Sequence, residues 1–358
     1  MTNRRSLKSL GKRWGLRRLA DASGHFLMLA TDQRTPLVQM LARLRDCAPE
    51  AVSLADISAV KRLLVEVLSP HASATLADPN YSYPVAIDVL RPNAGLLIAL
   101  EEHRFGETPQ GRYSTSIPGW SVDRIKRVGA DGVKLLVWYR PDAAPEVMAH
   151  QKTYVREIGR DCAANDIPLV LELLVYPFAR ADGQKADRIA DPAYHASLVI
   201  DSVREFARPE YGVDLLKLES PVPAAVLPAE DDAAGGANVQ ALFDELGRAT
   251  GGLPWVMLSA GAAKAQFRRV MRFAYGAGAN GFLAGRAIWA DAMAAFPDLD
   301  ACRAQLCASG VPYLRDLAAL TADEAPAWRC DYADLSGIDR EGEFVAAVPA
   351  LAATDNDR

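Results

Sequence analysis

Residues 167–175 read IPLVLELLV, an apolar run that one charged side chain, Glu172, interrupts. An apolar run this short and this continuous is typical of a parallel strand that is covered by helices on both faces. Strands of that kind occur in sheets built from alternating strands and helices. The run therefore predicts an α/β fold with a carboxylate inside its sheet.

Further runs of the same kind are spread along the chain, at 26–31, 73–77, 95–100, 132–138, 213–218, 254–260 and 280–284. Longer stretches between them carry apolar residues at helical spacing, as in 53–68, 145–164 and 264–277. Eight strands that alternate with helices predict a (β/α)8 TIM barrel in a single domain. An open doubly wound sheet is the alternative that a count of runs leaves.

Three segments fall outside this alternation of strands and helices. Residues 1–24 form a basic N-terminal extension, whose first 20 residues carry seven basic and no acidic side chains, so we expect a solvated basic helix ahead of the barrel at 25–330. Residues 223–237 are rich in Ala, Pro, Gly and acidic residues and predict an exposed loop. Residues 331–358 lose the periodicity and predict a weakly ordered tail.

The charge balance argues against nucleic acid as a partner, because 40 Lys and Arg against 45 Asp and Glu give a net charge of −5. The five Cys and five His are scattered, which argues against a disulfide framework and against a metal site. No apolar run approaches the roughly 18 residues of a membrane span. We therefore expect a cytoplasmic protein that binds no metal, membrane or nucleic acid.

Charged side chains stand in or directly after four of the runs, where apolar residues would pack better: Asp32, Lys134, Glu172 and Lys217. Glu219, two residues after Lys217, is expected on the same strand face. Residues at the C-terminal ends of barrel strands face the active site. A lysine in such a site is the nucleophile that a Schiff base with a ketone requires, and a nearby carboxylate supplies the acid that expels water. A buried Lys–Glu ion pair that ties neighbouring strands is the alternative interpretation.

Two glycine-containing strand ends predict a phosphate site. Ser259 stands near the end of the seventh run and Gly261 directly after it, and Gly285 and Arg286 follow the eighth. Barrels often bind phosphate in these two loops, where glycine permits a close approach of the backbone and arginine adds a charged donor. Turn glycines beside a surface arginine are the alternative.

The stretch GAGANG at 276–281 matches a dinucleotide-binding pattern by letter only. That pattern must follow a strand and open a helix, whereas here it follows a predicted helix and precedes a predicted strand. The stretch therefore predicts a helix end and a turn, and it gives no indication of NAD.

Taken together, these segments resemble the class I aldolases of the tagatose 1,6-bisphosphate aldolase type, a family that also includes sulfofructosephosphate aldolase. The resemblance runs in the family's order from about residue 20 to 320 and rests on LATDQR (29–34), GADGVKLLVWY (129–139), IPLVLELLVY (167–176), VDLLKLESPV (213–222), PWVMLSAG (254–261) and GFLAGRAIW (281–289).

The resemblance implies a barrel that works through a Schiff-base lysine, with no metal and no other cofactor. By motif position, Lys217 is implied as that lysine and Glu172 as the acid–base that moves protons during dehydration and C3–C4 cleavage. Lys134 is implied as the accessory lysine that activates the nucleophile and contacts substrate hydroxyls. Asp32 is implied as a hydroxyl-binding or proton-relay carboxylate.

The resemblance also implies how the substrate is held. Gln33 and Arg34 are implied as substrate ligands. The anion-binding group is implied to consist of Ser259, Gly261, Gly285 and Arg286.

The implied reaction is the cleavage of a ketohexose 1,6-bisphosphate, such as tagatose 1,6-bisphosphate, to dihydroxyacetone phosphate and glyceraldehyde 3-phosphate by a homo-oligomer. LELLVY (171–176) is closer to the tagatose-bisphosphate enzymes, whereas PWVMLSAG, FLAGRAIW and LLVWYR are closer to the sulfofructosephosphate enzymes. Cleavage of sulfofructose phosphate to dihydroxyacetone phosphate and sulfolactaldehyde is therefore an alternative. A zinc-dependent class II aldolase and a non-catalytic sugar-phosphate-binding barrel are the others.

Overall fold

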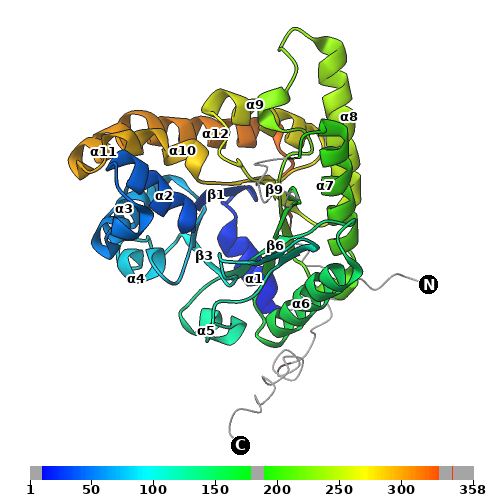
Figure 1. Cartoon of the computed structure of the whole chain (residues 1–358), viewed down its shortest axis with the longest axis horizontal. Helices are drawn as coiled ribbons and strands as arrows, with labels where there is room; N and C mark the ends of the chain where they lie inside the picture. The colour runs from blue at the N-terminus through cyan, green and yellow to red at the C-terminus, as the bar shows by residue number, and fades with distance from the viewer. Residues whose placement is uncertain (1–9, 179–188, 330–340, 342–358) are drawn as a thin grey trace, which may run out of the picture.

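The computed structural model describes residues 10–178, 189–329 and 341. Eight parallel strands close into a barrel in the order β1-β10-β9-β8-β7-β6-β3-β2 (Figure 1). The barrel strands are β1 (Phe26–Ala30), β2 (Ala74–Ala77), β3 (Gly95–Ala99), β6 (Gly132–Trp138), β7 (Leu169–Leu174), β8 (Leu215–Leu218), β9 (Trp255–Met257) and β10 (Gly281–Ala284). All eight predicted runs are confirmed as strands, and closure of the sheet excludes the open doubly wound alternative.

Helices surround the barrel (Figure 1). They are α2 (Thr35–Leu44), α3 (Leu54–Leu68), α4 (Ser82–Ala86), α5 (Val122–Arg127), α6 (Pro145–Ala164), α7 (Pro192–Phe206), α8 (Ala233–Ala249), α9 (Lys264–Gly276), α10 (Arg286–Trp289), α11 (Leu299–Gln305) and α12 (Val311–Glu324). A short antiparallel hairpin, β4 (Gly106–Thr108) with β5 (Gly111–Tyr113), lies in the connection from β3 to β6. No helix in the described part of the chain is long and apolar enough to cross a membrane.

The barrel interior explains why charged side chains in the strands meet. Val170 and Leu215 belong to a buried apolar cluster in the barrel interior, together with Met28, Leu97, Val256 and Leu283. Glu172 and Lys217 stand two residues further along the same strands, so they point to the same side. Glu172 also pairs with Lys217 in the register of β7 and β8, which places the two side chains next to each other.

The helix α1 (Leu10–Leu19) closes the N-terminal end of the barrel. Leu16 and Leu19 are fully buried and belong to the interior cluster. The Lys12 Nζ atom lies 2.8 Å from Oδ2 of Asp214, which directly precedes β8, and both side chains are buried. The prediction of a solvated basic helix is therefore wrong: the helix exists, but its apolar side chains fill the barrel floor and some of its basic groups pair with acids at the strand starts.

The prediction of a loop over 223–237 is also partly wrong. The helix α8 begins at Ala233, and the Asp232 side chain caps it by accepting a hydrogen bond from the Gly235 N–H. A 3-10 turn occupies Ala224–Val226. An acidic residue that precedes small residues can cap the start of a helix, as Asp232 does here. The composition of the segment does not distinguish such a helix start from a loop. Of the predicted tail at 331–358, only Glu341 is described.

We expect the barrel floor to be a measurable part of the stability. Leu16→Ala removes a fully buried side chain and leaves a cavity, so it should lower the free energy of unfolding by about 2–5 kcal/mol. The control is Trp14→Ala on the same helix, because Trp14 is 63% exposed and its loss should cost about 0.5 kcal/mol or less. Chemical denaturation measures both, and equal stabilities would contradict the packing of α1 under the barrel.

Candidate active site

Four charged side chains meet inside the barrel, and they are the four that the sequence singled out. The Lys134 Nζ atom lies 2.8 Å from Asp32 Oδ2 and 2.8 Å from Glu172 Oε2. The Lys217 Nζ atom donates a hydrogen bond of 2.9 Å to the same Glu172 Oε2 atom. All four side chains are buried. The predicted residues therefore form one ionic cluster, in which Asp32 follows β1 while Lys134, Glu172 and Lys217 stand within β6, β7 and β8.

The charges of this cluster stabilise one another. Burial disfavours ionisation of Asp32 and Glu172, but the Lys134 and Lys217 charges outweigh burial and hold both carboxyl pKa values below their usual range. Burial likewise disfavours the charged form of Lys134, but its carboxylate neighbours outweigh it and raise the Lys134 pKa well above the ordinary value. Lys134 is therefore held as an ammonium ion and the two carboxyls as carboxylates.

Glu101 belongs to the same cluster, although the sequence analysis missed it. It lies two residues after the end of β3 and is 3% exposed. Its Oε1 atom lies 2.8 Å from Lys134 Nζ, and its Oε2 atom accepts a hydrogen bond from the Leu136 N–H. Glu101 directly follows run 95–100, just as Asp32 directly follows run 26–31, so the same criterion selects both residues. The acidic pair Glu101 and Glu102, directly after run 95–100, was the signal that could have found it.

The two residues predicted as ligands beside Asp32 have different surroundings. The Arg34 guanidinium is buried and donates to the main-chain oxygen of Glu101 at 2.9 Å and to its Oε1 atom at 3.1 Å. Gln33 places its Oε1 atom out of solvent without a hydrogen bond from the described residues. Arg34 is thus held by Glu101, while the Gln33 Oε1 atom can still accept a hydrogen bond. Their role as substrate ligands stays a prediction.

The predicted anion-binding group comes together at the ends of β9 and β10. Gly261 adopts a left-handed φ of 79°, and a Cβ atom there would lie 3.4 Å from the Arg286 guanidinium carbon. A Cβ atom on Gly285 would lie 2.6 Å from the Ala30 oxygen and 2.8 Å from Gln33 Nε2, so glycine is required at this close approach. Burial lowers the pKa of Arg286, because the charged guanidinium has lost contact with water. A bound anion would stabilise that charge.

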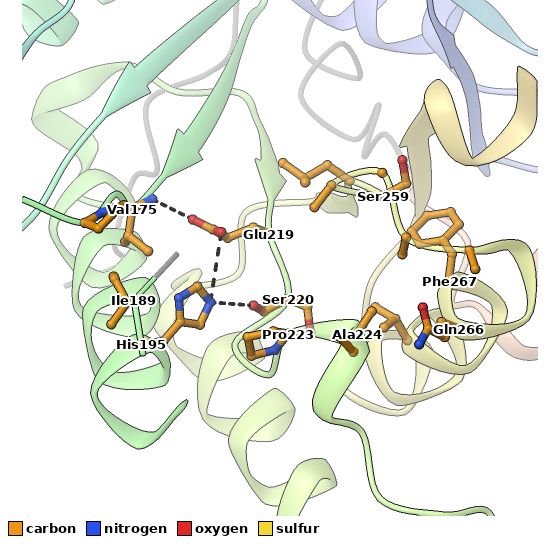
Figure 2. Close-up of a pocket in the computed structure, with 18 residues that line it drawn as sticks. Val175, Ile189, His195, Glu219, Ser220, Pro223, Ala224, Ser259, Gln266 and Phe267 are labelled. Atoms are coloured by element: carbon orange, nitrogen blue, oxygen red, sulfur yellow. Dashed lines mark hydrogen bonds and ion pairs between the residues drawn. The ribbon is translucent and has the colours of Figure 1, made fainter. Parts of the chain in front are cut away.

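A cavity of about 430 Å³ lies beside this group (Figure 2). Ser259 and Gly261 line it on one side, and Glu219 and His195 line it on the other. The strand β8 ends at Leu218, and the Glu219 Oε1 atom accepts a hydrogen bond from the Val175 N–H, while Oε2 lies 4.0 Å from His195 Nε2. Glu219 thus lines this cavity, whereas the carboxylate that contacts both Lys134 and Lys217 is Glu172.

Glu219 should make the stability depend on pH. Burial raises its pKa to about 8, so the folded state holds a proton that the unfolded chain releases at lower pH. Ionisation of Glu219 therefore costs stability progressively as the pH rises from about 5 to about 8. Glu219→Gln should gain stability relative to the wild type over that interval, as thermal unfolding at several pH values would measure. The exposed Glu230→Gln is the control and should give a constant difference.

No group of three His, Cys, Asp or Glu side chains in 10–178 and 189–329 is placed to hold a metal ion.

The comparisons with known proteins agree with this architecture. Residues 26–291 match the model of the DeoC/LacD family aldolase. Tagatose 1,6-diphosphate aldolase 2 of Streptococcus agalactiae serotype III (strain NEM316) is 32% identical over 325 residues, which are 89% of this chain and 97% of that protein. Tagatose 1,6-diphosphate aldolase of Lactococcus lactis subsp. lactis is 34% identical over 284 residues, which are 78% and 85% of the two chains.

Solved structures of aldolases share the fold. A fructose-bisphosphate aldolase from Plasmodium falciparum superimposes with a TM-score of 0.64 at 14% identity, over 88% of this chain and 95% of that one. An archaeal fructose 1,6-bisphosphate aldolase gives a TM-score of 0.54 at 17% identity, over 87% and 98%. The family model and the relatives above 30% identity, each spanning most of this chain, establish that the protein belongs to the DeoC/LacD family of aldolases.

Proposed function

We propose that this protein is a class I aldolase that cleaves a ketohexose 1,6-bisphosphate, such as tagatose 1,6-bisphosphate, to dihydroxyacetone phosphate and glyceraldehyde 3-phosphate. Lys217 is the Schiff-base lysine. The observation that carries the proposal is the contact of 2.9 Å between Lys217 Nζ and Glu172 Oε2, made beside a second lysine that is fixed by several carboxylates. The names of the relatives support tagatose 1,6-bisphosphate as the substrate.

The ionic contacts distinguish the two lysines. Lys134 contacts Asp32, Glu101 and Glu172, and this environment favours its ammonium form. An ammonium ion has no lone pair with which to attack a carbonyl. The ion pair described for Lys217 is with Glu172 alone, an oxygen that it shares with Lys134. Lys217 is therefore the better nucleophile, and Lys134 is the permanent cation beside it.

Glu172 is placed to prepare the nucleophile and the acid together. Transfer of one proton from the Lys217 ammonium to Glu172 Oε2 along their hydrogen bond yields a neutral amine and a protonated carboxyl group. The amine attacks the C2 carbonyl of the ketose to give a carbinolamine. Glu172 then protonates the departing hydroxyl, water leaves, and the nitrogen lone pair forms the iminium ion.

Cleavage returns the proton to Glu172. The Glu172 carboxylate removes the C4 hydroxyl proton, the C3–C4 bond breaks, and its electrons pass into the iminium ion to give an enamine on Lys217. The aldehyde half leaves. Glu172 reprotonates C3 of the enamine, and hydrolysis of the resulting iminium releases dihydroxyacetone phosphate and the free lysine. Asp32, whose pKa is held low, stays ionised and suits hydrogen bonds from substrate hydroxyls.

The phosphate nearest the ketone belongs at the loops after β9 and β10. Ser259 is buried there, Gly261 and Gly285 bring the backbone close, and Arg286 supplies a charge. The described residues form no ion pair with Arg286, so its guanidinium is available to an anion. A phosphorylated ketose anchored in this way carries its carbonyl towards the neighbouring strand β8 and Lys217.

The first test traps the intermediate. Incubation with dihydroxyacetone phosphate followed by borohydride should fix a three-carbon phosphate on Lys217, located by peptide mass spectrometry. Lys217→Met should lose both the adduct and turnover, because no other amine replaces the nucleophile. Lys152→Met, which changes a lysine on α6 that pairs with Glu205, is the control and should keep both. A folded wild-type protein without an adduct, or a Lys217→Met variant with more than a few per cent of activity, would refute the assignment.

The second test concerns the anion-binding group. Arg286→Met removes a charged hydrogen-bond donor and should raise KM for the ketose bisphosphate about 10- to 100-fold, because such bonds contribute roughly 1.5–3 kcal/mol. The control is Arg272→Met on α9, where the arginine is exposed and pairs with Glu324. Steady-state kinetics measure both variants, and an unchanged KM in Arg286→Met would place the phosphate elsewhere.

The third test separates the enzyme classes and the substrates. Activity should survive exhaustive dialysis against a chelator, because the Schiff base supplies the electron sink. Loss of activity that added zinc restores would favour a class II aldolase instead. The dialysed protein is then assayed with tagatose 1,6-bisphosphate, its C4 epimer fructose 1,6-bisphosphate and sulfofructose phosphate. We expect the highest kcat/KM for tagatose 1,6-bisphosphate, and a preference for sulfofructose phosphate would reassign the substrate.

A further inference from the structure

Glu101 joins two cations that come from different parts of the barrel. Its Oε1 atom lies 2.8 Å from Lys134 Nζ, on β6, and 3.1 Å from Arg34, at the start of α2. Its main-chain oxygen accepts a second hydrogen bond from the Arg34 guanidinium. A single buried carboxylate thus holds both cations at fixed positions.

Glu101 also completes the charge balance of the cluster. Asp32, Glu101 and Glu172 supply three buried carboxylates, and Lys134, Lys217 and Arg34 supply three cations. Without Glu101, the remaining two carboxylates face three buried cations. A buried charge that lacks a partner is costly, so the groups left behind would move or lose their charge.

Glu101 lies on the side of the barrel opposite the anion-binding group. In the strand order, β3 lies four strands from β9 and is therefore opposite it across the barrel. A ketose anchored by its first phosphate beyond β9 and β10, and bonded at C2 to Lys217 on β8, extends its remaining carbons towards the β3 and β6 side. Those carbons become the aldehyde, and Lys134 and Arg34 are the cations on that side.

We propose that Glu101 is a positioning residue for the aldehyde half of the substrate, acting through Lys134 and Arg34 without touching the reacting atoms. This inference rests on the proposed aldolase function. Glu101 holds Lys134 Nζ where it can meet the hydroxyls beyond C3, and it holds the Arg34 guanidinium beside them. The half that carries the ketone depends instead on Lys217 and the anion-binding group.

The test compares two reactions that use different parts of the substrate. Borohydride trapping of dihydroxyacetone phosphate needs the ketone half alone, whereas cleavage of a ketohexose bisphosphate needs both halves. In Glu101→Gln, the rate of trapping at Lys217 should stay within about twofold of the wild type, because the ion pairs of Glu101 are with Lys134 and Arg34, whereas Lys217 keeps its own contact with Glu172. The kcat/KM for cleavage should fall roughly 10- to 100-fold, as expected for misplaced catalytic groups.

The chain offers a matched control and a second variant. Glu102→Gln changes the neighbouring acid, which pairs with His103 and not with the cluster, and it should leave both reactions unchanged. Glu101→Asp keeps the charge but withdraws it by one methylene, so it should show the same split with a smaller fall in cleavage. This variant tests the inference if the glutamine variant does not fold.

The outcomes are separable. A wild-type chain that forms no adduct overturns the aldolase function and this inference with it. A wild-type adduct combined with variants in which trapping and cleavage fall equally gives Glu101 a purely structural role and overturns the inference alone. Cleavage that survives both substitutions does the same.

Discussion

The contact of one ammonium group with three carboxylates is the interaction on which this site depends. Lys134 on β6 meets Asp32 after β1, Glu101 after β3 and Glu172 on β7, so a single side chain ties together distant parts of the barrel wall. Each of these groups is costly to bury alone, and together they are mutually compensated. Glu172 also contacts Lys217, so the carboxylate that compensates the charge of Lys134 is in direct contact with the proposed nucleophile.

The fold could be predicted because its signal is local and repeated. Each barrel strand is a short apolar run, and eight of them with helices between favoured a barrel. The count left an open doubly wound sheet as the alternative, which the closed strand order excludes. Asp32, Lys134, Glu172 and Lys217 were found because a charge in or next to such a run has no packing role. Glu101 stands in the same position as Asp32, two residues past the end of its strand, so the same signal was present there and was overlooked.

Two segments show why composition was a poor guide to structure. The basic count of the first 20 residues says nothing of Leu16 and Leu19, which decide where α1 packs. Its basic residues find partners, such as Asp214 for Lys12, only in the folded barrel. Likewise, small and acidic residues after 223 suit both a loop and a capped helix start, and the cap at Asp232 selects the helix. Contacts distant in sequence decided the first case and one local cap decided the second, and composition shows neither.

The helix α1 limits the routes by which molecules can reach the proposed active site. Because α1 packs against the N-terminal end of the strands, the described barrel is closed at that end. Any molecule that reaches Lys217 must enter and depart through the same opening, past the loops at the C-terminal ends of the strands. In the proposed reaction, the aldehyde half has no covalent link to Lys217 and would leave by this opening before the half that is bonded to the lysine. The closed end thus gives the proposed reaction a single route for the entry of the substrate and for the exit of both products.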